Sequence, residues 1–272
     1  ALETARVLAT LAARGEWSPR RAVRFLWMPE LTGTHAWLAA DAGRAARTVA
    51  ALNLDMVGEN QAACGSTLLL EHPPFFSASF ATELLARIRA EALDGVNGFS
   101  GPGHYSMTRV AEVPYSGGSD HVTWIDPAHG VPCPMLIQWP DRFYHSSHDT
   151  VEHTDPASLA LAVRCSATYA GFLAAADDER TRWLAALVAR GARRRVLAAL
   201  DGPEAALGAG RERRRGARAL ASLARVGLPE AKCAAAVQEF ERFAEESGAS
   251  AEDLPRSGPV PRREILAPLD FH

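Results

Sequence analysis

Residues 139–156 read WPDRFYHSSHDTVEHTDP, and they separate a strand-like apolar run at 134–139 from a helix-like apolar run at 159–173. From the first histidine onward, the stretch contains three histidines and three carboxylates: His145, His148, Asp149, Glu152, His153 and Asp155. Metal-binding and proton-carrying side chains at the end of a strand are typical of α/β enzymes. The stretch alone is equally compatible with a solvated polar loop, so the rest of the chain has to decide.

Strand-like and helix-like segments alternate over the first two thirds of the chain. Apolar runs predict strands at residues 23–28, 49–57, 66–71, 110–113 and 133–138. Helical patterns predict helices at residues 2–14, 36–40, 79–93 and 159–173. This alternation predicts an α/β fold of three layers, in which a mixed, mostly parallel sheet is flanked by helices.

The character of the sequence changes at about residue 177. Residues 178–199, 210–226 and 229–247 are rich in Ala, Leu, Arg and Glu with helical periodicity, and the tail from residue 255 is rich in proline. We therefore expect a catalytic-type domain at 1–176 and a helical C-terminal region at 177–272, which ends in an extended tail.

Composition gives little support for nucleic acid or membrane as a partner. The formal net charge is −3, and the arginine cluster at residues 211–218 lies in a helical stretch, where a solvated face is expected. No apolar run in the sequence reaches transmembrane length, so no membrane-spanning segment is expected. The four cysteines are widely spaced, which excludes a zinc finger. Their small number argues against a disulfide scaffold and favours the cytoplasm.

Several carboxylates and histidines follow the predicted strands, so we expect them to meet at one edge of the sheet. The donors are Glu30, Asp55, Asp120, His121 and His145. A single acid after a strand is commonly a cap or a turn former. Carboxylate oxygens together with imidazole nitrogens suit zinc, and a catalytic zinc site keeps room for water.

Two other chemistries rank lower. A Ser–His–Asp triad would need Ser66 or Ser119, and neither lies in a GxSxG elbow. A cysteine nucleophile would need a setting at a helix N-terminus, which Cys64 does not show in the sequence.

Four segments, in this order, resemble the di-zinc aminopeptidases of the bacterial leucyl aminopeptidase type, and within them a bacterial subgroup of uncharacterised aminopeptidase-like proteins. They read VRFLWMPELTGTHAWLA, NLDMVGEN, PYSGGSDHVTW and WPDRFYHSSHDTVEHTDP. The resemblance covers residues 1 to about 175 and implies a zinc-exopeptidase-like fold. It also implies a hydrolase that removes N-terminal residues from a peptide or a small amide substrate with the help of two Zn²⁺.

The resemblance implies the roles of the metal-site residues. Asp55 matches a carboxylate ligand of one zinc, and His145 matches the imidazole ligand of the other. Asp149 matches the acid that supports this histidine.

The resemblance also implies the residues of the pocket. Asp120 and His121 match a motif that shapes the pocket wall, and Tyr115 matches a tyrosine that hydrogen-bonds the tetrahedral intermediate.

Glu30 departs from the family pattern, because the family has two adjacent glutamates and this chain has Pro29 before a single one. We assign Glu30 as the general base first and as a metal ligand second. His35 and Glu59 are the alternatives for the missing carboxylate.

The family's remaining histidine and its bridging aspartate precede the helix with which this sequence begins. The sequence is therefore expected to start inside the catalytic domain, to bind zinc weakly and to have little activity as this piece. Two other functions stay open: a non-catalytic binding or scaffold module of the same fold, and a related amide hydrolase or cyclase. The sequence leaves the oligomeric state open.

Overall fold

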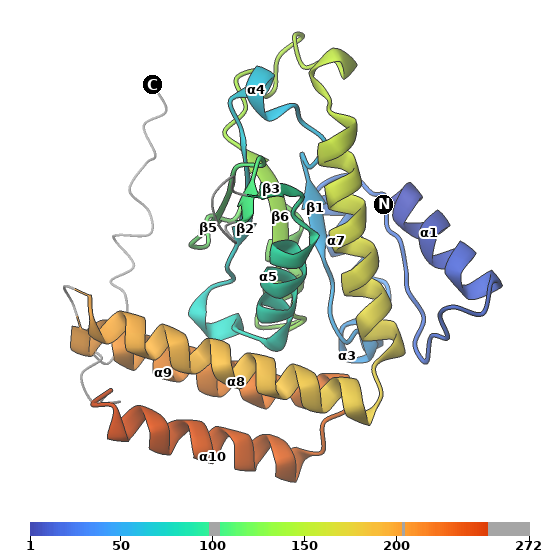
Figure 1. Cartoon of the computed structure of the whole chain (residues 1–272). Coiled ribbons are helices and arrows are strands. Elements are labelled where there is room, and N and C mark those ends of the chain that lie inside the picture. The colour runs from blue at the N-terminus through green and yellow to red at the C-terminus, as the bar shows by residue number, and fades with distance from the viewer. Residues whose placement is uncertain (98–103, 203–204, 250–272) are drawn as a thin grey trace, which may run out of the picture.

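The computed structural model describes residues 1–97, 104–202 and 205–249, and its first part is built on a four-stranded sheet (Figure 1). The strand order is β1-β6-β2-β5, with β1 at Asn53–Asp55, β2 at Thr67–Glu71, β5 at Val110–Val113 and β6 at Met135–Trp139. The pairs β1–β6 and β2–β5 are parallel, whereas β2 and β6 are antiparallel. The predicted mixed, mostly parallel sheet is confirmed. A separate antiparallel hairpin joins β3 (Gly95–Asn97) to β4 (His104–Ser106).

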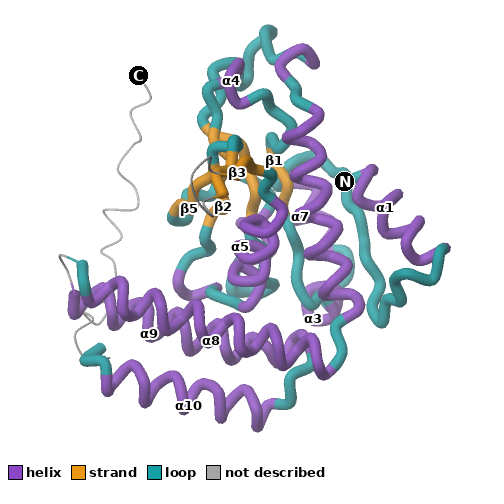
Figure 2. The backbone as a smooth tube through the Cα atoms, viewed as in Figure 1, coloured by secondary structure: helices purple, strands orange, loops and turns teal. Residues whose placement is uncertain are grey.

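Helices cover both faces of the sheet. In chain order they are α1 Leu2–Ala13, α2 Thr32–Ala39, α3 Gly43–Arg47, α4 Gln61–Cys64, α5 Phe80–Ala92, α6 His121–Ile125 and α7 Pro156–Ala175, with single 3₁₀ turns η1 Phe75–Ser77 and η2 Val151–His153. Figure 2 shows α5 and α7 on one face of the sheet. Leu70 and Leu136 of the strands belong to the same core as these two helices. A second core joins Leu38 of α2 to Trp124 of α6. The predicted three-layer α/β fold is therefore confirmed.

Three long helices follow at the end of the sheet away from α4 (Figure 1). They are α8 Asp178–Leu200, α9 Ala205–Ala221 and α10 Glu230–Glu246, with the 3₁₀ turn η3 Ser222–Val226 between the last two. This agrees with the helices expected there. The same core continues from Leu84 of α5 to Leu184 of α8, so the boundary between 1–176 and 177–272 stays a prediction. The tail expected from residue 255 lies outside the described residues.

The strand expected at residues 23–28 was wrong, and Trp27 in this segment is 64% exposed. An apolar run forms a strand only where a neighbour satisfies its backbone amides. The chain before this segment is held by α7 instead, because the backbone N–H groups of Arg20 and Arg21 both donate to the Ala174 carbonyl.

Helix α7 changes the expectation about membrane-length segments. It has 20 residues and a mean hydropathy of 1.3, so by length and composition alone it could cross a membrane. Half of this apolar window is buried inside the protein, and Leu161, Cys165 and Tyr169 belong to the core. The helix therefore has the features of a core helix as well.

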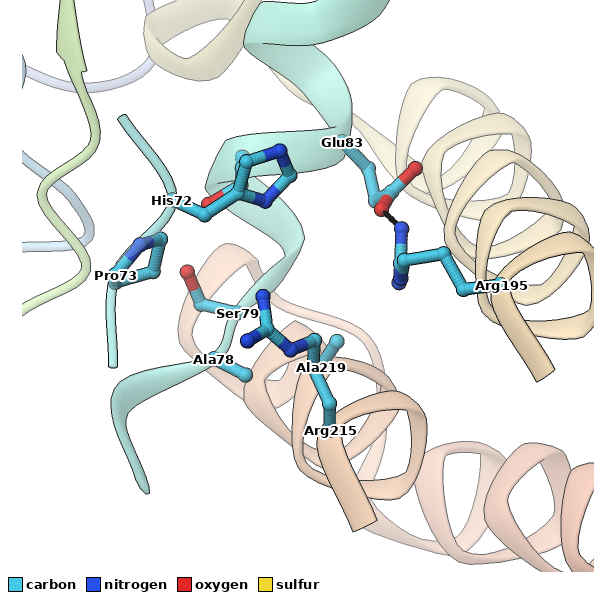
Figure 3. A pocket seen from close by; sticks show the side chains of 9 residues that line it. His72, Pro73, Ala78, Ser79, Glu83, Arg195, Arg215 and Ala219 are labelled. Carbon is cyan, nitrogen blue, oxygen red and sulfur yellow. Dashed lines mark hydrogen bonds and ion pairs between the residues drawn. The ribbon is translucent and has the colours of Figure 1, made fainter. Parts of the chain in front are cut away.

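A pocket at the junction of the sheet domain and the helical region is lined by an ion pair between Glu83 and Arg195 (Figure 3). Arg195 of α8 pairs with Glu83 of α5 and donates to Glu212 of α9 at 3.0 Å. None of the residues predicted for the active site lines this pocket. We therefore interpret it as part of the attachment between the two regions.

Gly216 of α9 packs closely against both α8 and α10, and Gly216→Ala is expected to destabilise the protein. A Cβ atom there would lie 2.4 Å from the Phe240 ring and 2.8 Å from the Ala192 Cβ, and both neighbours are buried. Overpacking costs about 1–3 kcal/mol, which exceeds the gain of about 1 kcal/mol in helix propensity.

Gly208→Ala in the same helix is the matched control for this measurement. Its Cβ would make an ordinary contact of 3.5 Å with Ala199, so propensity decides and stability should be unchanged or slightly higher. Urea denaturation compares the two variants. Equal stabilities would contradict the close packing at Gly216.

Candidate functional site

Asp55 and the segment 140–155 lie at the same edge of the sheet, because β1 and β6 are parallel and Asp55 pairs with Ile137. Asp55 is half-buried at the last position of β1. His145 is exposed in the segment that follows β6, with φ 55°, and its ring stacks on Tyr144 at 3.7 Å. Asp149 is also exposed. The structure thus brings the two predicted zinc ligands to one edge.

Glu59 adds a carboxylate to this edge. Both of its oxygens are buried, and neither has a hydrogen-bond partner among the described residues. Burial raises the pKa of Glu59 to about 7; the nearby Ser66 hydroxyl opposes this, although it makes no full hydrogen bond to the carboxylate, and the charges of Asp141, Asp149 and Asp55 reinforce it. Of the two alternatives for the missing carboxylate, Glu59 therefore lies within electrostatic reach of Asp55, whereas His35 is exposed on α2.

The expectation that all donors leave the same edge was wrong for Asp120 and His121. They follow β5, which is parallel to β2, and β2 runs antiparallel to β6. The chain after β5 therefore starts at the opposite edge. It then turns back toward β1, where the Asn53 side chain donates to Ser119 at 2.7 Å. Asn53 and Asp55 face the same side of β1, about 7 Å apart along the strand.

Asp120 fixes the turn that carries Glu30. Its Oδ1 accepts hydrogen bonds from the Leu31 backbone N–H at 2.9 Å and from the Thr34 hydroxyl at 2.7 Å. Leu31 has φ 56°, a conformation that is strained for a residue with a side chain. Glu30 itself is exposed and follows no strand. The turn therefore depends on a partner from the Tyr115–His121 side of the site.

His121 forms a buried pair with Glu71, the last residue of β2. His121 Nε2 and Glu71 Oε1 are 2.8 Å apart, and both side chains are 2% exposed. The Ser116 hydroxyl also donates to Glu71, and the Gly117 N–H does so at 3.3 Å. Burial raises the pKa of Glu71, but the hydrogen bonds from His121 and Ser116 outweigh it, so the pKa lies below its usual value.

Tyr115 lies against this pair. Its ring meets the His121 ring edge-on at 5.7 Å, and its side chain is partly exposed. Burial, followed by the charge of Glu71, raises the pKa of Tyr115. The phenol therefore stays protonated at neutral pH and is able to donate a hydrogen bond.

Sequence reasoning missed three residues at these positions. Glu71 looked like part of an apolar strand, although a lone acid at the end of LLLE was a usable signal. Cys64 was considered only as a nucleophile, and Asp141 was not considered. Their spacing to Glu59 becomes meaningful only after the strands are paired.

The predicted donors suit zinc in kind, but Glu30, Asp55 and His145 do not form a compact group. Among the described residues, the three-ligand group of His, Cys, Asp or Glu consists of Glu59, Cys64 and Asp141. Asp55 and His145 remain able to supply one carboxylate and one imidazole at the shared edge. The predicted roles of the site residues stay predictions.

Comparison with known proteins gives one family. The model of peptidase family M28 matches residues 1–170. Among solved structures, an aminopeptidase from Aneurinibacillus sp. strain AM-1 is similar, with 21% sequence identity and a TM-score of 0.37. The match covers 52% of this chain and 30% of that one, so this chain spans less than a third of that aminopeptidase. No curated protein matches the chain.

Proposed function

The chain belongs to peptidase family M28, and from this membership we propose that it acts in a zinc-dependent exopeptidase that removes N-terminal residues from peptides. The observation that carries the proposal is the placement of Asp55 and the His145 segment after two neighbouring parallel strands. A carboxylate and an imidazole at one sheet edge are the donor types of a catalytic zinc site.

Each residue of the site has a role in this proposal. Asp55 and His145 would hold zinc, of which two ions are proposed per complete site, and Asp149 would orient His145. Zinc supplies Lewis acidity at the scissile carbonyl.

The remaining steps belong to the side chains around the turn of Glu30. Glu30 takes a proton from the attacking water and returns it to the leaving amine. The Tyr115 phenol donates to the oxygen of the tetrahedral intermediate. Asp120 holds the turn of Glu30, and His121 supports Tyr115.

The test uses the protein that carries this chain and two peptides that differ only in N-terminal acetylation. We expect release of the N-terminal amino acid from the free peptide alone. Removal of metal by a chelator should abolish the release, and added Zn²⁺ should restore it. Asp55→Ala should lower both zinc content and activity.

Asp201→Ala is the control, because Asp201 is an exposed acid at the end of α8. It should leave zinc content and activity unchanged. Equal cleavage of both peptides, or activity that survives removal of metal, would exclude the proposed function.

A second function has one observation in its favour. Glu30, Asp55 and His145 do not form a compact ligand group among the described residues, as a non-catalytic binding module of the same fold would allow. Such a module would bind the free peptide without cleaving it. A related amide hydrolase or cyclase would instead act on a blocked or glutamine-headed substrate in the same assay.

A further inference from the structure

Glu59, Cys64 and Asp141 meet in space although they come from three separate pieces of the chain. One carboxylate oxygen of each acid and the Cys64 Sγ all lie within 4.8 Å of one another. In a tetrahedral zinc site the ligand atoms are roughly 3.4–3.6 Å apart, as follows from Zn–O and Zn–S lengths of about 2.1 and 2.3 Å. Side-chain rotations that move these atoms by about 1 Å would therefore bring them to the separations found between zinc ligands.

The backbone holds Glu59 in place. The Gln138 side chain accepts from the Glu59 N–H at 2.7 Å and donates to the Glu59 carbonyl at 2.9 Å. Gln138 lies on β6 and is 1% exposed. Glu59 is therefore attached to a central strand rather than carried on a free loop.

The short helix α4 brings Cys64 back toward Glu59. The Asn60 side chain caps its first turn by accepting from the N–H groups of Ala62 and Ala63. Gly65, with φ 78°, ends the helix one residue after Cys64.

Two hydrogen bonds from backbone N–H groups fix the position of Asp141. Its Oδ1 accepts from the Phe143 N–H at 2.9 Å. The N–H of Arg142, the residue after Asp141, donates to the Cys64 carbonyl at 3.1 Å. Rigid backbones of this kind favour a preorganised site.

The Glu59 carboxylate lacks the partners that a buried charge needs. Both oxygens of Glu59 are out of contact with solvent, and neither has a hydrogen-bond partner among the described residues. Asp55 and Asp149 add negative charge nearby. The Arg142 guanidinium lies beside Gly65, and the described residues show no ion pair between it and the group. A buried carboxylate is stable when it is paired or bound to a metal.

We propose that Glu59, Cys64 and Asp141 form a binding site for one borderline-soft divalent cation of the zinc class, separate from the site of Asp55 and His145. A thiolate among the ligands disfavours Ca²⁺ and Mg²⁺, which prefer oxygen alone. Three protein ligands leave a fourth position of a tetrahedral ion for water. The ion would tie α4 and the segment after β6 to the end of β1.

The test is a titration of the full chain with Co²⁺ or Cd²⁺, read by absorption in the near ultraviolet. Bonds between thiolate and metal give a charge-transfer band there, and the predicted catalytic donors include no cysteine. We expect the band to saturate at one ion per chain. Cys64→Ala should abolish it, and Glu59→Gln should lower the affinity by more than the roughly 10–100-fold that loss of an outer-shell partner costs.

Cys233→Ala is the matched control. Cys233 is buried like Cys64. The Cys233 Sγ lies 3.6 Å from the Leu228 carbonyl oxygen, and the Cys64 Sγ lies 3.7 Å from the His153 carbonyl oxygen. The control should keep the band, and circular dichroism should show both variants folded. Absence of the band with both metals, or a band that persists in Cys64→Ala, would overturn the proposal.

A further variant separates this proposal from the proposed peptidase function. Asp55→Ala combined with His145→Ala should remove peptidase activity and keep the charge-transfer band. Loss of the band in this double variant would mean that the cysteine belongs to the same site. A chain that shows the band but never cleaves peptides would refute the function alone.

Discussion

Glu30→Gln is expected to lower peptide turnover by about 10²–10⁴-fold, the usual contribution of a general base. Glutamine keeps the size of the side chain and its hydrogen bonding but cannot accept the proton from water. Glu30 is exposed, and the Asp120 hydrogen bonds to Leu31 and Thr34 hold its turn, so the fold should survive the substitution. Zinc content should stay the same, because the carboxylate acts on the proton.

Metal analysis together with steady-state kinetics checks this result. Glu16→Gln is the control, because Glu16 is an exposed glutamate in the turn after α1. It should leave turnover unchanged. If Glu30→Gln loses zinc together with activity, Glu30 is a ligand and the base has to be sought elsewhere. Glu59 is then the next residue to replace, since its carboxylate lies within electrostatic reach of Asp55.

The sequence predicted the parts of the fold that depend on local pattern. Apolar runs with a neighbour to pair with became strands, as at Thr67–Glu71 and Val110–Val113. Helical periodicity placed α5, α7 and α8 within a few residues. The strand predicted at residues 23–28 did not form, because the composition of an apolar run carries no information about whether a partner strand exists.

The candidate site was harder to predict, because strand direction decides it. Asp55 and the segment after β6 share an edge as expected. The antiparallel pairing of β2 with β6 sent the chain after β5 to the other edge, and no local pattern shows that reversal. Glu71 and Asp141 acquire a role only through partners that are more than 40 residues away in the chain.

Replacement of Glu71 by alanine is expected to destabilise the protein by about 3–5 kcal/mol, the cost of removing one partner of a buried pair. The His121 ring, the Ser116 hydroxyl and the Gly117 N–H would each lose an acceptor in a region that excludes water. This cost is a large fraction of the 5–15 kcal/mol, roughly, that stabilises a typical protein. Chemical denaturation measures it.

Glu112→Ala is the matched control. Glu112 lies on β5, the strand next to β2, and also pairs with a histidine, His72, at 2.8 Å. Its side chain is 47% exposed, against 2% for Glu71. Exposed pairs contribute about 0–1 kcal/mol. Glu112 also pairs at 3.1 Å with Arg89, whose side chain is 7% exposed, so this variant should lose some stability but less than Glu71→Ala. Equal losses in the two variants would show that burial does not set the strength of the Glu71–His121 pair.

The pH dependence of stability gives an independent test of the same pair. The pKa of Glu71 lies below its ordinary value of 4.5 in the folded protein, so its ionised form contributes stability above pH 4.5. That contribution is lost as the pH falls from 4.5 through the lower, folded-state pKa. The glutamine of Glu71→Gln does not titrate. The difference in unfolding free energy between the wild type and this variant should therefore stay constant above pH 5, about half a unit above the ordinary pKa, and it should shrink at lower pH. A difference that grows at lower pH would mean that the pKa of Glu71 is raised by burial and not lowered by the hydrogen bonds from His121 and Ser116. Since the Tyr115 ring rests on His121, loosening of the pair should also lower peptide turnover in Glu71→Gln before the fold is lost.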